Sequence, residues 1–156
     1  MLHQRREILK RGGLLAALAS SGLLTGRAAW AGADALAFGE ELAFGAASMD
    51  EALKALGGIP AVESQIVFTL PELVENGAVV PVSVESKLRG TSEIFIVVEA
   101  NPNPMAARFT IPEGTEPFVA TRIKVAQTCS VFALVRAEGK LYSASRLTKV
   151  TIGGCG

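Results

Sequence analysis

The sequence predicts an all-β protein: an immunoglobulin-like antiparallel β-sandwich with a short N-terminal helix and a flexible C-terminal arm. After Pro60, runs of four to eight residues rich in Val, Ile, Phe and Thr alternate with clusters of Pro, Gly and Asn, the pattern of short sandwich strands and their turns. In 80–85, valines alternate with proline or polar residues, which is typical of a half-buried strand. About seven or eight such runs fit one sandwich.

The helix is expected at 48–56, before the first strand. Ser48 and Glu51 have the spacing of a capping box, in which each side chain accepts a hydrogen bond from a backbone N–H at the start of the helix. Gly57 and Gly58 provide the positive φ that ends a helix. The alanine-rich segment 34–45 is expected to be a short helix or a mobile arm.

The strands are predicted from the apolar runs, and the turns from the residues between them. Asn76-Gly77 and Glu138-Gly139-Lys140 indicate turns. Pro81 indicates a sheet edge or a bulge, because proline cannot donate a ladder hydrogen bond. The predicted strands are Gln65 to Leu70, Ala78 to Glu85, Glu93 to Ala100, Met105 to Ile111, Phe118 to Val125, Val131 to Arg136, Leu141 to Ser145 and Leu147 to Ile152.

The N-terminus has the pattern of an export signal. Arg5 and Arg6 precede an apolar run at 12–24 and the small residues 28–31, the order of a secretory signal peptide. The apolar run has 13 residues, fewer than the roughly 20 needed for a membrane span, which favours a cleaved signal peptide. A retained membrane anchor or a basic amphipathic helix is the alternative. We expect residues 1–31 to be a signal peptide of the twin-arginine type, and residues 32–156 to be a single exported domain located in the periplasm.

The composition of 32–156 excludes several functions. It has 10 basic and 14 acidic residues, a balance that does not favour binding to nucleic acid or anionic membranes. The only histidine, His3, lies in the predicted signal peptide, so no imidazole is left for a nucleophile pair or a metal site. Cys129 and Cys155 are too far apart for a compact zinc site. We expect no cofactor and no bound metal.

The group with chemical potential is Cys155, in the sequence Gly153-Gly154-Cys155-Gly156. Glycine neighbours give the cysteine backbone freedom and little steric shielding, and the extended chain from Val150 to Cys155 spans about 17 Å. No activating cation or histidine is evident beside the thiol, and the terminal carboxylate would disfavour the thiolate. The segment is therefore expected to be a substrate arm without a catalytic nucleophile. A tail whose cysteine forms a disulfide, with Cys129 or between two molecules, is the alternative.

These residues resemble the SoxY family, the sulfur-carrier subunits of the periplasmic thiosulfate-oxidising Sox system. The resemblance covers most of the predicted mature chain. It rests on the Gly-Gly-Cys-Gly segment together with Leu70-Pro71-Glu72, residues 75–82, Asn101-Pro102, Thr121-Arg122-Ile123 and Val150-Thr151-Ile152.

The resemblance implies a function for Cys155 and its neighbours. Cys155 would be the covalent attachment point for sulfur intermediates, held as a persulfide or S-thiosulfonate, and Gly153, Gly154 and Gly156 would form a swinging arm. The protein would pair with a SoxZ-like β-sandwich subunit as a heterodimer. It would serve a c-type cytochrome, a sulfate-releasing hydrolase and, in some systems, a sulfane dehydrogenase. It would be a carrier and not an enzyme.

Two features depart from the family pattern. The family tail commonly ends with a further glycine, and Cys129 has no counterpart. Cys129 is expected to be a buried, unreactive thiol. The alternative function is an exported β-sandwich interaction module whose tail cysteine forms an intermolecular disulfide. A thiol oxidoreductase fits least well, because the chain lacks a Cys-x-x-Cys pair.

Overall fold

A computed structural model describes residues 41–151. Residues 41–45 are helical, in agreement with one of the two states expected for 34–45, whose earlier part lies outside the described residues. The further elements of the described chain are α3 (Met49–Ala55), β1 (Ala61–Val62), β2 (Ile66–Thr69), β3 (Leu73–Val74), β4 (Val80–Ser86), β5 (Thr91–Val98), β6 (Met105–Thr110), β7 (Phe118–Ile123), β8 (Cys129–Ala137) and β9 (Lys140–Val150).

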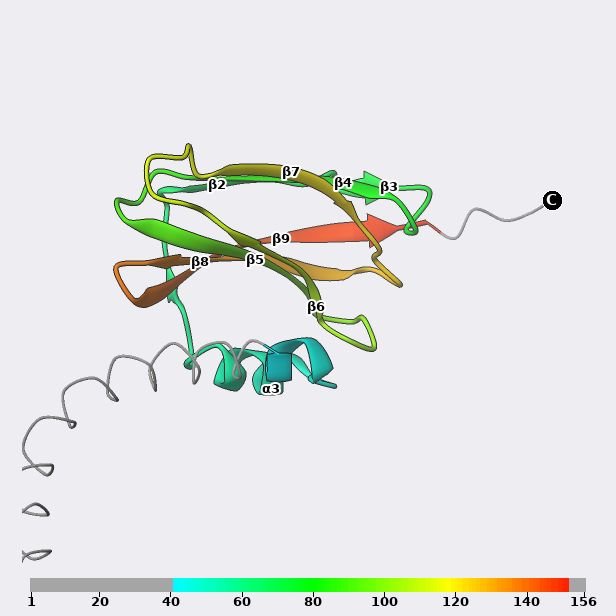
Figure 1. The fold of residues 1–156 in the computed structure, drawn as a ribbon. Helices are drawn as coiled ribbons and strands as arrows, with labels where there is room; N and C mark the ends of the chain where they lie inside the picture. Colours follow the sequence, from blue (N-terminus) through cyan, green and yellow to red (C-terminus); the bar gives the residue numbers. More distant parts are fainter. Residues whose placement is uncertain (1–40, 152–156) are drawn as a thin grey trace, which may run out of the picture. The chain divides into compact units, whose positions relative to one another are not determined.

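The strands form two sheets that lie face to face, as Figure 1 shows. The larger sheet has the order β1-β9-β8-β5-β6, and β3 also pairs with β9. The smaller sheet has the order β2-β4-β7, all antiparallel. The predicted all-β sandwich is therefore confirmed.

The helix α3 begins and ends where its capping residues predict. The Ser48 hydroxyl accepts a hydrogen bond from the Glu51 N–H at 3.3 Å. The Glu51 carboxylate accepts from the Ala47 N–H at 3.0 Å, one residue earlier than the standard capping box requires. Gly57 and Gly58 follow the helix with φ of 110° and 115°, values that favour glycine because it has no Cβ.

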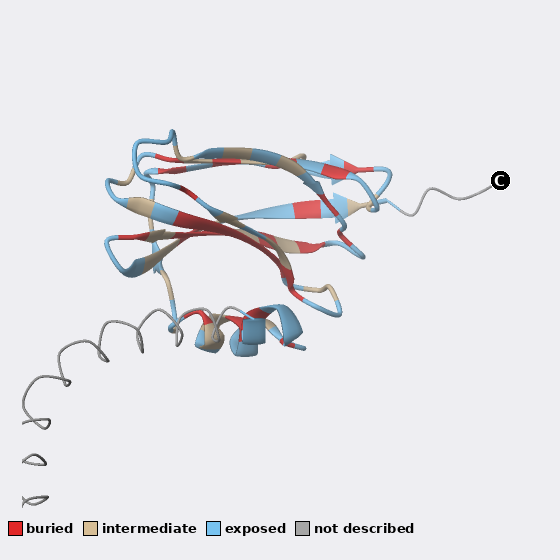
Figure 2. Ribbon diagram, in the orientation of Figure 1, coloured by how far each residue is buried: buried red, intermediate tan, exposed pale blue. Residues whose placement is uncertain are grey.

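Strand β5 is buried on both faces and separates two apolar cores (Figure 2). Ile94, Ile96 and Val98 lie in the core between the two sheets. Phe95 and Val97 point to the opposite face of the larger sheet and lie in a second core with Leu56, Met105 and Leu134. The side chains of a strand alternate between faces, so one continuous apolar run supplies both cores.

A buried ionic cluster lies at the N-terminal end of β5. The Glu93 carboxylate lies 2.6 Å from Arg108 Nη2 and 2.6 Å from Arg136 Nε. Arg136 also donates a 3.3 Å hydrogen bond to the Leu56 carbonyl oxygen, and its guanidinium lies 5.6 Å from the centre of the Phe95 ring. Arg136 thus connects the end of α3 to the sheet that the helix covers.

Three details of the strand prediction were wrong. The two strands predicted at Leu141–Ser145 and Leu147–Ile152 are one strand, β9, because β8 pairs with it continuously from Thr148 to Lys140. The two-residue strands β1 and β3 were missed. Both pair parallel to β9, so the larger sheet is not wholly antiparallel. These short strands lack a length over which an alternating pattern can be recognised.

Pro81 lies in the central strand of the smaller sheet, yet at a local edge. Its register partner in β7 is Arg122, whereas the pairing of β2 with β4 ends at Thr69 and Ser83. Strand β4 therefore has only one neighbour at Pro81. A proline, which has no backbone N–H to donate, is therefore tolerated at this position as it is on an edge strand.

Candidate functional site

The predicted attachment residue Cys155 and its collar, Gly153, Gly154 and Gly156, lie outside the described residues. The structure does describe the chain up to Thr151, the residue from which the predicted arm departs. The described part of the candidate site is therefore the base of the predicted arm, at the end of β9.

On one side, the end of β9 is held by the segment that contains β3. The Lys149 N–H donates to the Glu72 carbonyl oxygen at 2.8 Å, and the Thr151 N–H donates to the Val74 carbonyl oxygen at 2.9 Å. One residue before Lys149, the hydroxyl of the fully buried Thr148 donates to the Pro71 carbonyl oxygen at 2.7 Å. These bonds fix the backbone up to Thr151.

On the opposite side of β9, two loops hold Val150 in place. Its N–H donates to the Thr128 hydroxyl at 3.0 Å. Its side chain lies close to Gly77, where an added Cβ would lie 3.1 Å from Val150 Cγ1 and 2.3 Å from the Val125 carbonyl oxygen. The Val125 N–H in turn donates to the Gly77 carbonyl oxygen at 2.7 Å. Only glycine fits this close approach, whereas the sequence had indicated Gly77 merely as a turn residue.

Hydrogen bonds of two asparagine side chains stabilise these loops. Asn76 Oδ1 accepts from the Ala78 N–H at 3.0 Å, which closes the predicted turn. Asn101 connects two loops: its Nδ2 donates to the Lys124 carbonyl oxygen at 2.8 Å, and its Oδ1 accepts from the Ala126 N–H at 3.0 Å. Segments far apart in the sequence therefore converge where the described part of β9 ends, at the tip of the β9 arrow in Figure 1.

Cys129 lies one strand away but is buried, with 7% of its surface exposed. Its register partner is Thr148 of β9. Burial raises the pKa of the Cys129 thiol; a backbone hydrogen bond with Ala100 lowers it, and the charge of Glu99 raises it further. A buried thiol with a raised pKa is a poor nucleophile. The expected burial of Cys129 is confirmed, and its low reactivity stays a prediction.

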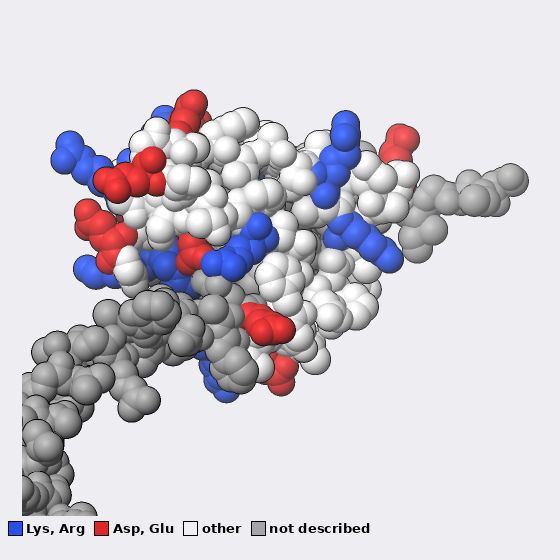
Figure 3. All heavy atoms as spheres, viewed as in Figure 1, with Lys and Arg blue, Asp and Glu red and all other residues white. Residues whose placement is uncertain are grey.

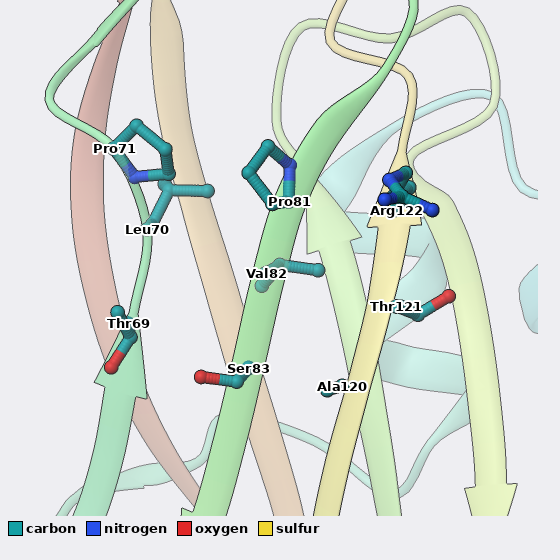
Figure 4. Close-up of a pocket in the computed structure, with 9 residues that line it drawn as sticks. All are labelled: Thr69, Leu70, Pro71, Pro81, Val82, Ser83, Ala120, Thr121 and Arg122. Carbon is teal, nitrogen blue, oxygen red and sulfur yellow. The ribbon is translucent and has the colours of Figure 1, made fainter.

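An open groove lies on the smaller sheet near the same end of the sandwich. Figure 4 shows its lining, which comes from the end of β2, the start of β4 and the end of β7. The groove was not predicted from the sequence, because it forms only where three strands pair, and residues 120–122 lie far along the chain from 69–71 and 81–83. The lining residues are Thr69, Leu70, Pro71, Pro81, Val82, Ser83, Ala120, Thr121 and Arg122.

In the described part of the chain, the charged side chains are dispersed over the face shown in Figure 3 and form no cluster suited to a metal ion. Within residues 41–151, no group of three His, Cys, Asp or Glu side chains is placed to hold a metal ion. On the face shown in Figure 3, Lys and Arg are interspersed with Asp and Glu and separated by uncharged surface. No helix in the described part of the chain is long and apolar enough to cross a membrane.

Comparisons with known proteins converge on one family. The family model described as "Sulfur oxidation protein SoxY" matches residues 53–155. Among solved structures, the chain is similar to the sulfur carrier protein SoxY from Chlorobium limicola f thiosulfatophilum, with a TM-score of 0.60 and 38% sequence identity. That alignment covers 71% of this chain and 98% of the other. No match was found among curated protein sequences.

Proposed function

The chain belongs to the SoxY family of sulfur oxidation proteins, and from this premise we propose that it carries thiosulfate-derived sulfur covalently on Cys155. In this proposal Cys155 is the attachment atom, and Gly153, Gly154 and Gly156 form the arm that brings it to partner enzymes. The family match extends to residue 155 and so includes the cysteine.

The observation that carries the proposal is the contrast between the two cysteines. Cys129 is buried in the sandwich, and its pKa is raised, so its thiol is poorly suited to react with an anionic sulfur compound. Cys155 lies four residues beyond Thr151, the fixed and exposed end of the described chain. Four extended residues reach about 14 Å, which is enough for entry into the cleft of an enzyme.

The carrier chemistry requires two steps that this chain cannot complete alone. Joining thiosulfate to the Cys155 sulfur forms an S–S bond and releases one proton and two electrons, which an oxidising partner such as a c-type cytochrome must accept. Adding water to the terminal sulfonate then releases hydrogen sulfate and leaves a persulfide on Cys155. We therefore assign the chain a role as carrier and not as enzyme, with a hydrolase performing the second step.

The remaining parts of the proposal concern location and partners. Residues 1–31 are proposed to direct export through the twin-arginine pathway, and residues 32–156 to work in the periplasm. A SoxZ-like β-sandwich subunit is the proposed heterodimer partner. A sulfane dehydrogenase would act on the persulfide where the system contains one.

The test is complementation of a strain that lacks every copy of this gene. Cys155→Ser should abolish thiosulfate-dependent oxygen uptake, because serine cannot form the S–S bond. Cys129→Ser serves as the matched control and should retain uptake if the variant is folded and exported. Full activity of the Cys155→Ser strain would refute the carrier role.

A further inference from the structure

The turn that begins at Asn76 has an exposed asparagine side chain folded over the following peptide bond. The Asn76 side-chain oxygen Oδ1 accepts a 3.0 Å hydrogen bond from the Ala78 N–H, and its main-chain oxygen accepts one from the Val79 N–H at 3.4 Å. The first bond closes a ring that contains the Asn76-Gly77 peptide bond. The amide carbon of the Asn76 side chain is therefore held beside the Gly77 nitrogen.

The Gly77 nitrogen is available to react with this amide. No oxygen of residues 41–151 accepts a hydrogen bond from the Gly77 N–H. Glycine also has no Cβ that could block an approach to its nitrogen. Asparagine is one of the thermolabile residues of proteins, and a following glycine leaves its side-chain amide open to attack by the main chain. The turn thus combines a labile amide with an unshielded backbone nitrogen.

The other asparagines of the chain lack this route. The sequence contains two of them, Asn101 and Asn103, and they are followed by Pro102 and Pro104. A proline nitrogen carries no hydrogen, so it cannot be deprotonated to attack the preceding side chain. Asn76 is therefore the one asparagine of the chain whose amide can react with the next backbone nitrogen.

We propose that Asn76 is a site of spontaneous modification, at which the bond to Gly77 becomes an isoaspartyl linkage. Hydroxide removes the proton of the Gly77 nitrogen, and this nitrogen forms a bond to the side-chain amide carbon of Asn76. The amide nitrogen takes a proton from water and leaves as ammonia, so a succinimide ring remains. Water then opens the ring at the main-chain carbonyl carbon of Asn76. The product has one new carboxylate and a main chain that is longer by one methylene group, and no oxidant or reductant takes part.

The longer main chain does not fit the close contacts of Gly77. A Cβ added there would lie 2.3 Å from the Val125 carbonyl oxygen and 3.1 Å from Val150 Cγ1. The Gly77 carbonyl oxygen also accepts a 2.7 Å hydrogen bond from the Val125 N–H. An inserted methylene group displaces Gly77 from these partners, one residue before the described chain ends at Thr151. The modification therefore loosens the base of the predicted arm.

The site is tested by incubating the purified protein at 37 °C and pH 8, followed by peptide mapping with mass spectrometry. The peptide that contains Asn76 should gain the mass difference between an amide and an acid, and electron-transfer fragmentation should identify the isoaspartyl linkage. The peptide with Asn101 and Asn103 should stay unchanged. Asn76→Ser is the matched control, because serine can accept the same backbone hydrogen bond but has no amide to lose. Urea below the unfolding transition should not change the rate, since the folded turn itself reacts.

The structural consequence is tested on the modified form, which anion exchange separates by its additional negative charge. Amide hydrogen exchange at Val125 and Thr151 should become severalfold faster than in the unmodified protein, because local opening requires less free energy. Asn76→Asp is the control for this measurement, since it adds the charge without lengthening the main chain. It should leave both exchange rates close to those of the unmodified protein.

Two results would overturn the proposed site: modification of Asn76 only after unfolding, or equal modification of Asn101. If Asn76 is modified but exchange at Val125 and Thr151 stays the same, the proposed loosening of the arm base is wrong. All of these results leave the carrier function untouched, because that function depends on Cys155 and is tested by the loss of thiosulfate oxidation in Cys155→Ser.

Discussion

The buried hydroxyl of Thr148 donates a 2.7 Å hydrogen bond to the carbonyl oxygen of Pro71. This bond joins the last strand of the larger sheet to the segment that leaves the smaller sheet after β2. It lies three residues before Thr151, where the described chain ends. The bond therefore stabilises the base of the predicted arm together with the edge of the groove.

Thr148→Val should destabilise the fold while preserving the shape of the side chain. Pro71 is half-buried, and the loss of the hydrogen bond to its carbonyl oxygen should lower the free energy of unfolding by about 1 kcal/mol. Urea unfolding measures this change, and amide hydrogen exchange at Thr151 should become faster. Thr110→Val, at an exposed position on β6, is the control, and we expect a change within about 0.5 kcal/mol. Equal stability of the two variants would contradict a structural role for the bond.

Gly77→Ala should also loosen the base of the arm. The new Cβ would lie 2.3 Å from the Val125 carbonyl oxygen, so the backbone of one loop must move. Overpacking of this kind costs about 1–3 kcal/mol, measurable as a lower denaturant midpoint. Gly45→Ala is the control, because a Cβ there meets nothing within 4 Å. A Gly77→Ala variant as stable as the wild type would show that the two loops separate easily.

Cys129 should resist alkylation in the folded protein. Burial raises its pKa, so a smaller fraction is thiolate at a given pH than for an exposed cysteine. With iodoacetamide at pH 8, peptide mass spectrometry should find label on Cys155 at once and on Cys129 only after unfolding. Comparable labelling of both cysteines in the folded state would contradict the assigned burial.

The same pKa shift predicts a pH dependence of stability. A raised pKa in the folded state means that the folded protein retains the Cys129 proton at pH values where the unfolded chain has lost it. Stability from this residue is thus fully present below the ordinary thiol pKa and declines as pH rises towards the folded value. Cys129→Ala should remove this component of the alkaline loss in urea unfolding measured from pH 7 to 10. An unchanged alkaline slope would contradict the prediction.

Glu93→Gln should destabilise the larger sheet strongly. Its carboxylate pairs with Arg108 and Arg136, and removing one member of a buried ion pair costs about 3–5 kcal/mol because the other charge remains. Thermal and urea unfolding measure the loss. The control, Glu116→Gln in an exposed loop, should change stability by less than about 0.5 kcal/mol. Similar effects from both variants would show that the cluster contributes little.

Local patterns predicted those parts of the fold that depend on neighbouring residues. The valine alternation of β4 predicted its buried face, and Ser48 predicted the start of α3. Glu138 and Gly139 both have positive φ, at 50° and 75°, which matches a two-residue hairpin turn. In each case the physical cause lies within a few residues of the chain.

Structural features that depend on contacts between distant segments were not predicted from the sequence. Ser145 and Arg146 interrupt the apolar pattern of β9, yet the strand continues because β8 pairs with it throughout. The Arg146 guanidinium donates to the Phe68 carbonyl oxygen, so a residue that suggested a break connects the two sheets. The groove and the anchoring of Thr151 by Val74 likewise arise only when separate segments meet.

For the candidate site, the sequence and the structure describe complementary parts. The glycine-flanked Cys155 was predicted from the sequence, and it lies outside the described residues. The structure describes the base from which the predicted arm departs, and it shows that the other cysteine is buried. The hydrogen bond from Thr148 to Pro71 has no local sequence signal, since a threonine on a strand is ordinary.

The carrier function is tested most directly by intact-protein mass spectrometry of the mature chain from thiosulfate-exposed cells, before and after reduction, with the modified residue located by digestion. A carrier should show reducible additions of sulfur or thiosulfate on Cys155 and none on Cys129. An unmodified Cys155, or a stable Cys155 disulfide as its only form, would contradict the carrier function and favour an interaction module with a disulfide-bonded tail.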